Sequence, residues 1–158
     1  AVVAETVKPG DTVADVGSGA GLPGIPMALA QPEANFVLIE PMERRSNWML
    51  EVIEELGLEN VQVRRARAEE VLDLRFDIVT ARAVAALDKL LRMCVPLLKP
   101  GGSLIALKGS KAAEEIEAAK KLQKKLGIAS FEIQIYGENF LAEPTSVVKT
   151  TLDSSGEK

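Results

Sequence analysis

The stretch Asp15-Val16-Gly17-Ser18-Gly19-Ala20-Gly21-Leu22-Pro23-Gly24-Ile25-Pro26 decides the fold of this 158-residue chain. It grows out of the apolar, β-branched run 12–16, which predicts a short buried strand. Three glycines follow at alternate positions, and glycine has no Cβ to keep the backbone away from a ligand. Pro23 stands at a predicted helix start, a position at which the missing amide of proline costs no hydrogen bond. The stretch therefore predicts a strand, a glycine turn and a helix start that together bind a cofactor.

The spacing of the glycines bears on the choice of cofactor. Dinucleotide sites usually carry Gly-x-Gly-x-x-Gly, whereas this chain has Asp-x-Gly-x-Gly-x-Gly. The second pattern suits a ligand with an amino-acid end and no pyrophosphate, which means S-adenosylmethionine. A plain flexible turn is the alternative for this stretch alone, because glycine is common in turns.

Strand and helix patterns alternate along the rest of the chain, which predicts an α/β fold with a mainly parallel sheet. Apolar runs predict strands at 35–40, 61–64, 76–81 and 103–108, and two further extended segments at 131–136 and 146–152. Helical spacing predicts helices at 23–30, 43–56, 85–98 and 111–126. In the helix 43–56 we expect Trp48 to pack in the core. We expect one domain over residues 1–152 and a disordered polar tail over residues 153–158.

Composition excludes several classes of protein. The net charge of −4 argues against a non-specific nucleic-acid binder, although it leaves room for a local basic patch. The chain has no histidine, so a histidine-based triad or an imidazole zinc site is impossible, and we expect no metal. No apolar run approaches the ~20 residues that cross a bilayer. The single cysteine, Cys94, forms no internal disulfide and suits a reducing cytoplasm.

Side chains at the predicted carboxyl ends of strands are the candidate ligand contacts, because those ends form the crevice of an open parallel sheet. Glu40 ends the second strand and is placed to bind ribose hydroxyls, unless it is simply solvated. Ala68 and Glu69 follow the third strand, where adenine would lie. Arg82 and Lys108 end the fourth and fifth strands, and the alternative for Arg82 is a surface salt bridge.

These features together resemble the class I S-adenosylmethionine-dependent methyltransferases, a Rossmann-like fold in which a late hairpin adds an antiparallel strand. The segments 15–26, 67–70, 80–84 and 106–109 are similar to those of the ribosomal small-subunit RNA methyltransferase G family, also called glucose-inhibited division protein B. That family methylates guanine N7 in 16S ribosomal RNA. Its members carry an N-terminal helical segment before the first strand, and we expect this segment to be missing here.

The resemblance implies a cofactor site and a substrate side. Gly17, Leu22, Ala68, Glu69 and Arg82 would contact S-adenosylmethionine, and Lys108 would lie near the RNA. As hydrogen-bond donors, Arg82 and Lys108 are also the candidates to hold guanine O6 or a neighbouring phosphate. With the residues predicted from position, the expected cofactor-binding set is Asp15, Gly17, Gly19, Gly21, Leu22, Glu40, Ala68, Glu69 and Arg82. The implied partner is 16S ribosomal RNA or the small ribosomal subunit. We expect the protein to be a monomer in the cytoplasm.

The residues are chemically consistent with transfer to guanine N7. That atom has an in-plane lone pair and no proton, so no strong general base is needed, and no residue is assigned as catalytic. Methylation of pyrimidine C5 would need a cysteine nucleophile, whereas Cys94 is expected to pack in the core. Two alternatives stay open: a small-molecule methyltransferase of the same fold, and an NAD-binding or nucleotide-binding Rossmann module.

Overall fold

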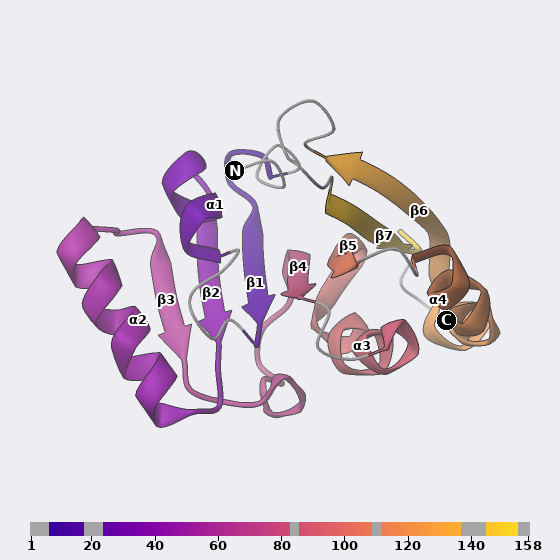
Figure 1. Cartoon of the computed structure of the whole chain (residues 1–158), viewed down its shortest axis with the longest axis horizontal. Coiled ribbons are helices and arrows are strands. Elements are labelled where there is room, and N and C mark those ends of the chain that lie inside the picture. Colours follow the sequence, from indigo (N-terminus) through magenta and orange to yellow (C-terminus); the bar gives the residue numbers. More distant parts are fainter. Residues whose placement is uncertain (1–6, 18–23, 83–85, 109–111, 137–144, 155–158) are drawn as a thin grey trace.

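The computed structural model describes residues 7–17, 24–82, 86–108, 112–136 and 145–154. Strands and α-helices alternate along this part of the chain, with short 3-10 turns labelled η (Figure 1). In chain order the elements are β1 (Thr12–Val16), α1 (Gly24–Ala30), β2 (Asn35–Ile39), α2 (Glu43–Leu56), β3 (Val61–Arg64), η2 (Ala68–Glu70), β4 (Phe76–Arg82), α3 (Leu87–Cys94), η3 (Val95–Leu97), β5 (Leu98–Lys108), α4 (Ala112–Ala119), η4 (Lys120–Leu122), α5 (Gln123–Leu126), β6 (Ile128–Tyr136) and β7 (Thr145–Leu152).

The strands form one seven-stranded sheet with the order β3-β2-β1-β4-β5-β7-β6. The strands from β1 to β5 pair in parallel, and β7 lies antiparallel between β5 and β6. This is the Rossmann-like α/β fold of the class I methyltransferases, with the late antiparallel strand that the resemblance implies. From β1 the chain first builds outward through β2 and β3, then returns to place β4 on the other side. The strand order therefore reverses between β1 and β4.

Two apolar clusters, one on each face of the sheet, form the core. One cluster holds Val13, Ile78 and Ile105 of the sheet together with buried residues of α1 and α2. The other holds the neighbouring sheet residues, such as Ala14 and Val79, with buried residues of α3 and α4. Because successive side chains of a strand point to opposite faces, both faces of these nearly continuous apolar strands are buried, as a parallel sheet requires.

Two predicted helices are shorter than expected. The segment 85–98 forms α3 only as far as Cys94 and then a 3-10 turn that contains Pro96. Proline has no amide for the helical ladder and its ring clashes with the preceding turn, so the α-helix ends there. The segment 111–126 is likewise divided into α4, η4 and α5.

Helix α2 has the predicted bounds but a narrower buried face. Met49 and Ile53 are buried, whereas Trp48 is 47% exposed. The prediction that Trp48 packs in the core is therefore wrong. The helical period explains the error, since a spacing of three or four residues also brings the flank of an apolar stripe into the pattern.

The predicted tail begins inside the described residues. The Asp153 amide donates to the Gly127 carbonyl at 2.8 Å, and the Gly101 amide donates to the Asp153 carbonyl at 3.2 Å. These bonds attach Asp153 to β5 and to the residue before β6. Residues 155–158 lie outside the described part of the chain.

Candidate cofactor and substrate site

The carboxyl ends of β1 and β4 lie side by side at the point where the strand order reverses. In an open α/β sheet, this switch point is where ligands bind. The residues in register there are Asp15 on β1 and Thr80 on β4. In Figure 1 the arrowheads of β1, β2 and β3 point to this edge of the sheet, which we call the carboxyl edge.

Asp15 joins three elements at the carboxyl edge. Its side chain is buried, and its Oδ2 accepts a hydrogen bond of 3.0 Å from the amide of Gly24, the first residue of α1. The Thr80 hydroxyl donates to Oδ1 at 3.1 Å. A hydrogen bond to a carboxylate is stronger than one between neutral groups. The acid of the motif thus holds the start of α1 against β1 and β4.

Two glycines of the motif meet different constraints. Gly17 has φ +67°, a region that side chains rarely adopt, and its amide donates to the Ile39 carbonyl at 2.9 Å. Gly24 is required for space, because a Cβ there would collide with Leu38 and lie 2.8 Å from Asp15 Oδ2. The three predicted contacts Gly19, Gly21 and Leu22 lie outside the described residues.

Glu40 follows β2 at the same edge and is buried. Its Oε2 accepts a hydrogen bond of 2.9 Å from the Met42 amide, and its backbone carbonyl accepts one of 3.1 Å from the Ser46 hydroxyl. Its own amide donates to the Arg64 carbonyl of β3 at 3.0 Å. The Met42 amide therefore holds the carboxylate, while Ser46 and Arg64 hold the Glu40 backbone at the end of β2.

The other predicted contacts lie along the same edge. Ala68 is buried and Glu69 exposed in the turn η2 after β3. Arg82 is the exposed last residue of β4 and is in register with Leu107 of β5, directly before Lys108. Only the backbone of Lys108 is described. The structure thus brings the described members of the predicted set to one edge.

Cys94 packs in the core, as expected, and is fully buried. Burial raises the pKa of its thiol to about 12, and the Glu69 carboxylate adds to the effect. A thiol with that pKa stays protonated near neutral pH and is not a nucleophile. The side chain therefore takes no part in a covalent mechanism.

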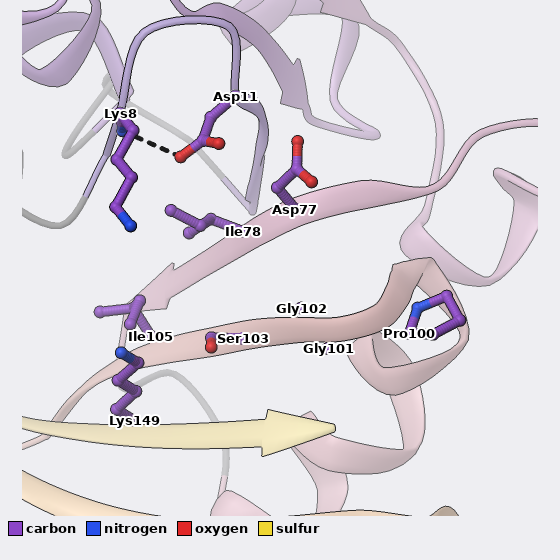
Figure 2. A pocket seen from close by; sticks show the side chains of 10 residues that line it. All are labelled: Lys8, Asp11, Asp77, Ile78, Pro100, Gly101, Gly102, Ser103, Ile105 and Lys149. Atoms are coloured by element: carbon purple, nitrogen blue, oxygen red, sulfur yellow. Dashed lines mark hydrogen bonds between the residues drawn. The ribbon is translucent and has the colours of Figure 1, made fainter. Parts of the chain in front are cut away.

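A hollow of about 270 Å³ lies at the opposite, amino-terminal edge of the sheet (Figure 2). Its lining includes Lys8, Asp11, Asp77, Ser103 and Lys149. It contains none of the predicted site residues. The Asp11 carboxylate on its wall already accepts a hydrogen bond from the Lys8 amide at 2.9 Å. Among the described residues, no group of three His, Cys, Asp or Glu side chains lies where it could hold a metal ion.

Two positioning residues were missed in the sequence. Thr80 and Ser46 anchor Asp15 and Glu40, respectively, through their hydroxyl groups. Thr80 had a usable signal, because it is a polar residue within a strand that is otherwise buried. Ser46 lies within a polar stretch of α2 and is distinguished only by its burial.

Comparison with known families shows which family this chain belongs to. Residues 1–142 match the family model described as rRNA small subunit methyltransferase G, or GidB. The chain belongs to this family. The match contains the glycine stretch, Glu40, Glu69, Arg82 and Lys108.

Individual relatives agree with the family match. Proteins named ribosomal RNA small subunit methyltransferase G are 46% identical in Paenarthrobacter aurescens and 48% identical in Pseudarthrobacter chlorophenolicus. These alignments cover 99% and 100% of this chain, and 73% and 74% of the two relatives. The relative from Mycobacterium leprae is 47% identical, over 95% of this chain and 62% of its own length.

Solved structures show the same fold at lower identity. M. jannaschii TYW2, crystallised in complex with AdoMet, has a TM-score of 0.74 at 23% identity and covers 94% of this chain and 71% of its own. An S-adenosylmethionine-dependent O-methyltransferase from Thermotoga maritima has a TM-score of 0.73 at 18% identity, over 99% of this chain and 65% of its own. Among the described residues, no helix is both long and apolar enough to cross a membrane.

Proposed function

We propose that this protein transfers a methyl group from S-adenosylmethionine to N7 of a guanine in 16S ribosomal RNA. The observation that carries the proposal is the family match over residues 1–142, which spans the whole carboxyl edge of the parallel strands. The relatives' name supplies the substrate class, the RNA of the small ribosomal subunit. A small-molecule methyltransferase or an NAD-binding module is not favoured.

The described residues fit S-adenosylmethionine. Gly24 has no room for a side chain and is tied to Asp15, so the start of α1 lies close to the sheet. Glu40, fixed by the Met42 amide, lies where ribose hydroxyls bind in this fold. We propose that Glu40, Gly17, Ala68, Glu69 and Arg82 contact the cofactor, together with the glycines and Leu22 of the loop. We assign Asp15 a positioning role, because its carboxylate is buried and accepts hydrogen bonds from protein groups.

The chemistry asks mainly for positioning. S-adenosylmethionine supplies an electrophilic methyl group, which bonds to the N7 lone pair as the carbon–sulfur bond breaks toward sulfur. No proton leaves N7, so the exposed carboxylate of Glu69 is not required as a base. Arg82 and Lys108 are suited to hold guanine O6 or a neighbouring phosphate, because both are donors at adjacent strand ends. Holding two reactants in line can contribute about 7–11 kcal/mol to lowering a barrier.

Methyl transfer from labelled S-adenosylmethionine to small ribosomal subunits tests the proposal. We expect incorporation at a guanine N7, read out by cleavage of the RNA at the methylated base. Arg82→Ala should lower the rate while the melting temperature stays within a few degrees. No incorporation by the protein, also when supplied with the additional residues of its relatives, would refute the proposed activity.

Calorimetry with S-adenosylhomocysteine and with NAD separates the proposed cofactor from its main competitor. We expect binding of S-adenosylhomocysteine and none of NAD. The opposite result would leave only a dinucleotide-binding module.

We further propose a single methyltransferase domain over residues 1–152, supported by the one sheet that contains all of the described strands. We propose that it acts as a monomer in the cytoplasm, where ribosomal subunits are found. Light scattering after size-exclusion chromatography tests the monomer.

A further inference from the structure

The first half of α2 presents an exposed indole beside two arginines. Trp48 is 47% exposed, the largest side chain among the exposed apolar residues that the structure describes. Arg44 and Arg45 precede it by four and three residues, which makes both its neighbours on the helix surface. Both arginines are exposed. We call these three residues the α2 surface.

The two arginines are not neutralised by the ion pairs around them. Nearby, Arg64 pairs with Asp73 at 2.9 Å and Arg65 pairs with Glu43 at 3.1 Å. Neither Arg44 nor Arg45 forms an ion pair within the described part of the chain. The acid closest to them in sequence, Glu43, is the one already engaged by Arg65.

The position of these arginines opposes the intrinsic preference of a helix. The amino-terminal end of a helix carries partial positive charge, so cations in the first turn are destabilising there. In α2, Arg44 and Arg45 share the first turn with Glu43, and the acids Glu51, Glu54 and Glu55 lie in the later turns. Proteins break such local rules at functional or strained sites, which makes the two arginines candidates for a ligand contact.

The α2 surface lies at the carboxyl edge. Figure 1 shows the start of α2 at the end of the sheet to which β1, β2 and β3 point. The Ser46 hydroxyl donates to the Glu40 carbonyl at 3.1 Å, which fixes this part of the helix to the residue that we propose binds ribose. Whatever binds the α2 surface is therefore held at a set position relative to the cofactor site.

We propose that the α2 surface binds a single-stranded segment of the small-subunit RNA outside the target guanine. Arginines attract phosphates, and an exposed indole offers a face on which a base stacks. The net charge of the chain is −4, which disfavours general affinity for nucleic acid. A local positive surface would still bind RNA beside the site of methyl transfer. The inference rests on the proposed function and adds a substrate contact to it.

Kinetics with small ribosomal subunits test the arginines. We expect the double variant Arg44→Gln/Arg45→Gln to raise KM for subunits about tenfold, with kcat and the Kd for S-adenosylhomocysteine unchanged. For binding to subunit RNA, the plot of log K against log salt concentration should become less steep by about 1.4, because two phosphate contacts are lost. The matched control is Lys124→Gln/Lys125→Gln, which removes two exposed charges from α5. Equal behaviour of the two double variants would overturn the proposal.

Trp48 reports on its own contact, because it is the only tryptophan in the chain. Titration with protein-free 16S ribosomal RNA should quench its emission and protect it from iodide. Trp48→Ala should raise KM for subunits about tenfold, whereas Leu50→Ala, an equally exposed apolar residue of α2, should not. If KM rises in the variants but RNA leaves the emission unchanged, a ribosomal protein occupies the surface and the RNA assignment is wrong. If the wild-type protein methylates subunits and none of these variants differs from it, the proposed function stands and this inference fails.

Discussion

Strands β1 and β4 are joined at both ends by an aspartate and a threonine, with the two residues exchanged between the strands. At the carboxyl edge, the Thr80 hydroxyl of β4 donates to Asp15 of β1 at 3.1 Å. At the amino edge, the Thr12 hydroxyl of β1 donates to Asp77 of β4 at 3.0 Å. The pairs differ in what else the carboxylate binds. Asp15 is buried and holds the Gly24 amide, whereas Asp77 is partly exposed and pairs with Lys99 at 3.3 Å.

The Thr12–Asp77 pair only joins the two strands, whereas the Asp15–Thr80 pair also positions the start of α1. Both pairs join β1 to β4, but Asp15 also fixes the residue at which the cofactor loop returns to α1. Asp77 instead fixes the Thr12 amide at 2.8 Å and one lysine. We therefore expect changes at the carboxyl edge to affect stability and cofactor binding together, and changes at the amino edge to affect stability alone.

The largest effect is expected for Asp15→Ala. The substitution leaves the buried Gly24 amide without its acceptor, and an unsatisfied buried donor costs about 1–3 kcal/mol. The loop also loses its anchor, so affinity for S-adenosylhomocysteine should fall by more than about tenfold. Thermal unfolding and calorimetry measure the two effects. Asp77→Ala is the control, and an equal loss of affinity in that variant would abolish the distinction between the edges.

Glu40→Ala should weaken cofactor binding with a smaller effect on folding. Loss of charge-assisted hydrogen bonds to ribose should cost about 1–3 kcal/mol of binding free energy. Asp11→Ala, at the hollow of the amino edge, should leave the Kd for S-adenosylhomocysteine unchanged. A Kd for Glu40→Ala equal to that of the wild type would remove Glu40 from the site.

Gly24→Ala and Gly102→Ala compare close packing at the two edges. A Cβ at Gly24 would lie 2.8 Å from Asp15 Oδ2, and one at Gly102 would lie 2.9 Å from the Lys99 carbonyl oxygen. Overpacking of this kind typically costs about 1–3 kcal/mol, so both variants should unfold at lower denaturant concentration. Only Gly24→Ala should also weaken binding of S-adenosylhomocysteine. A parallel loss in Gly102→Ala would show that affinity follows global stability.

The smallest effect is the acid sensitivity conferred by Asp77. Partial burial by itself would raise the pKa of Asp77, but the Thr12 amide and hydroxyl and the Lys99 ammonium together lower it below 3.8. A carboxyl whose folded pKa is depressed stabilises the fold above its unfolded pKa and loses that contribution as pH falls through the folded value. Denaturant titrations should therefore show the wild type losing stability more steeply than Asp77→Asn below about pH 4. Parallel curves for the two proteins would contradict this assignment.

The sequence was sufficient for the fold because its strongest signals are local. The bounds of β1, α2 and β3 are as predicted, and the carboxyl edge of the sheet contains Asp15, Glu40 and Arg82 as expected. Few topologies are possible for parallel strands that alternate with helices. Once the strands were predicted, it followed that their carboxyl ends lie at one edge of the sheet.

What the sequence could not supply depends on contacts between distant residues. The Thr80 hydroxyl meets Asp15 across 65 positions of the chain. The polarity of Thr80 within a buried strand marks the residue but does not say which partner it binds. The exposure of Trp48 depends on how α2 rolls against the sheet, which the helical period leaves undetermined within about one residue. For the same reason we propose for Asp15, which was expected to contact the cofactor, a role in positioning the start of α1.

The place of β7 in the sheet has a consequence during synthesis on the ribosome. Strand β6 leaves the ribosome before β7, yet its partner in the sheet is β7, which also pairs with β5. Until β7 arrives, β5 and β6 both present unpaired strand edges, and such edges promote association between nascent chains. By then β1 to β4 already have all of their partners in the sheet. We expect a released chain truncated after residue 144 to be protected from proteolysis at β1–β4 and to be cleaved at β6.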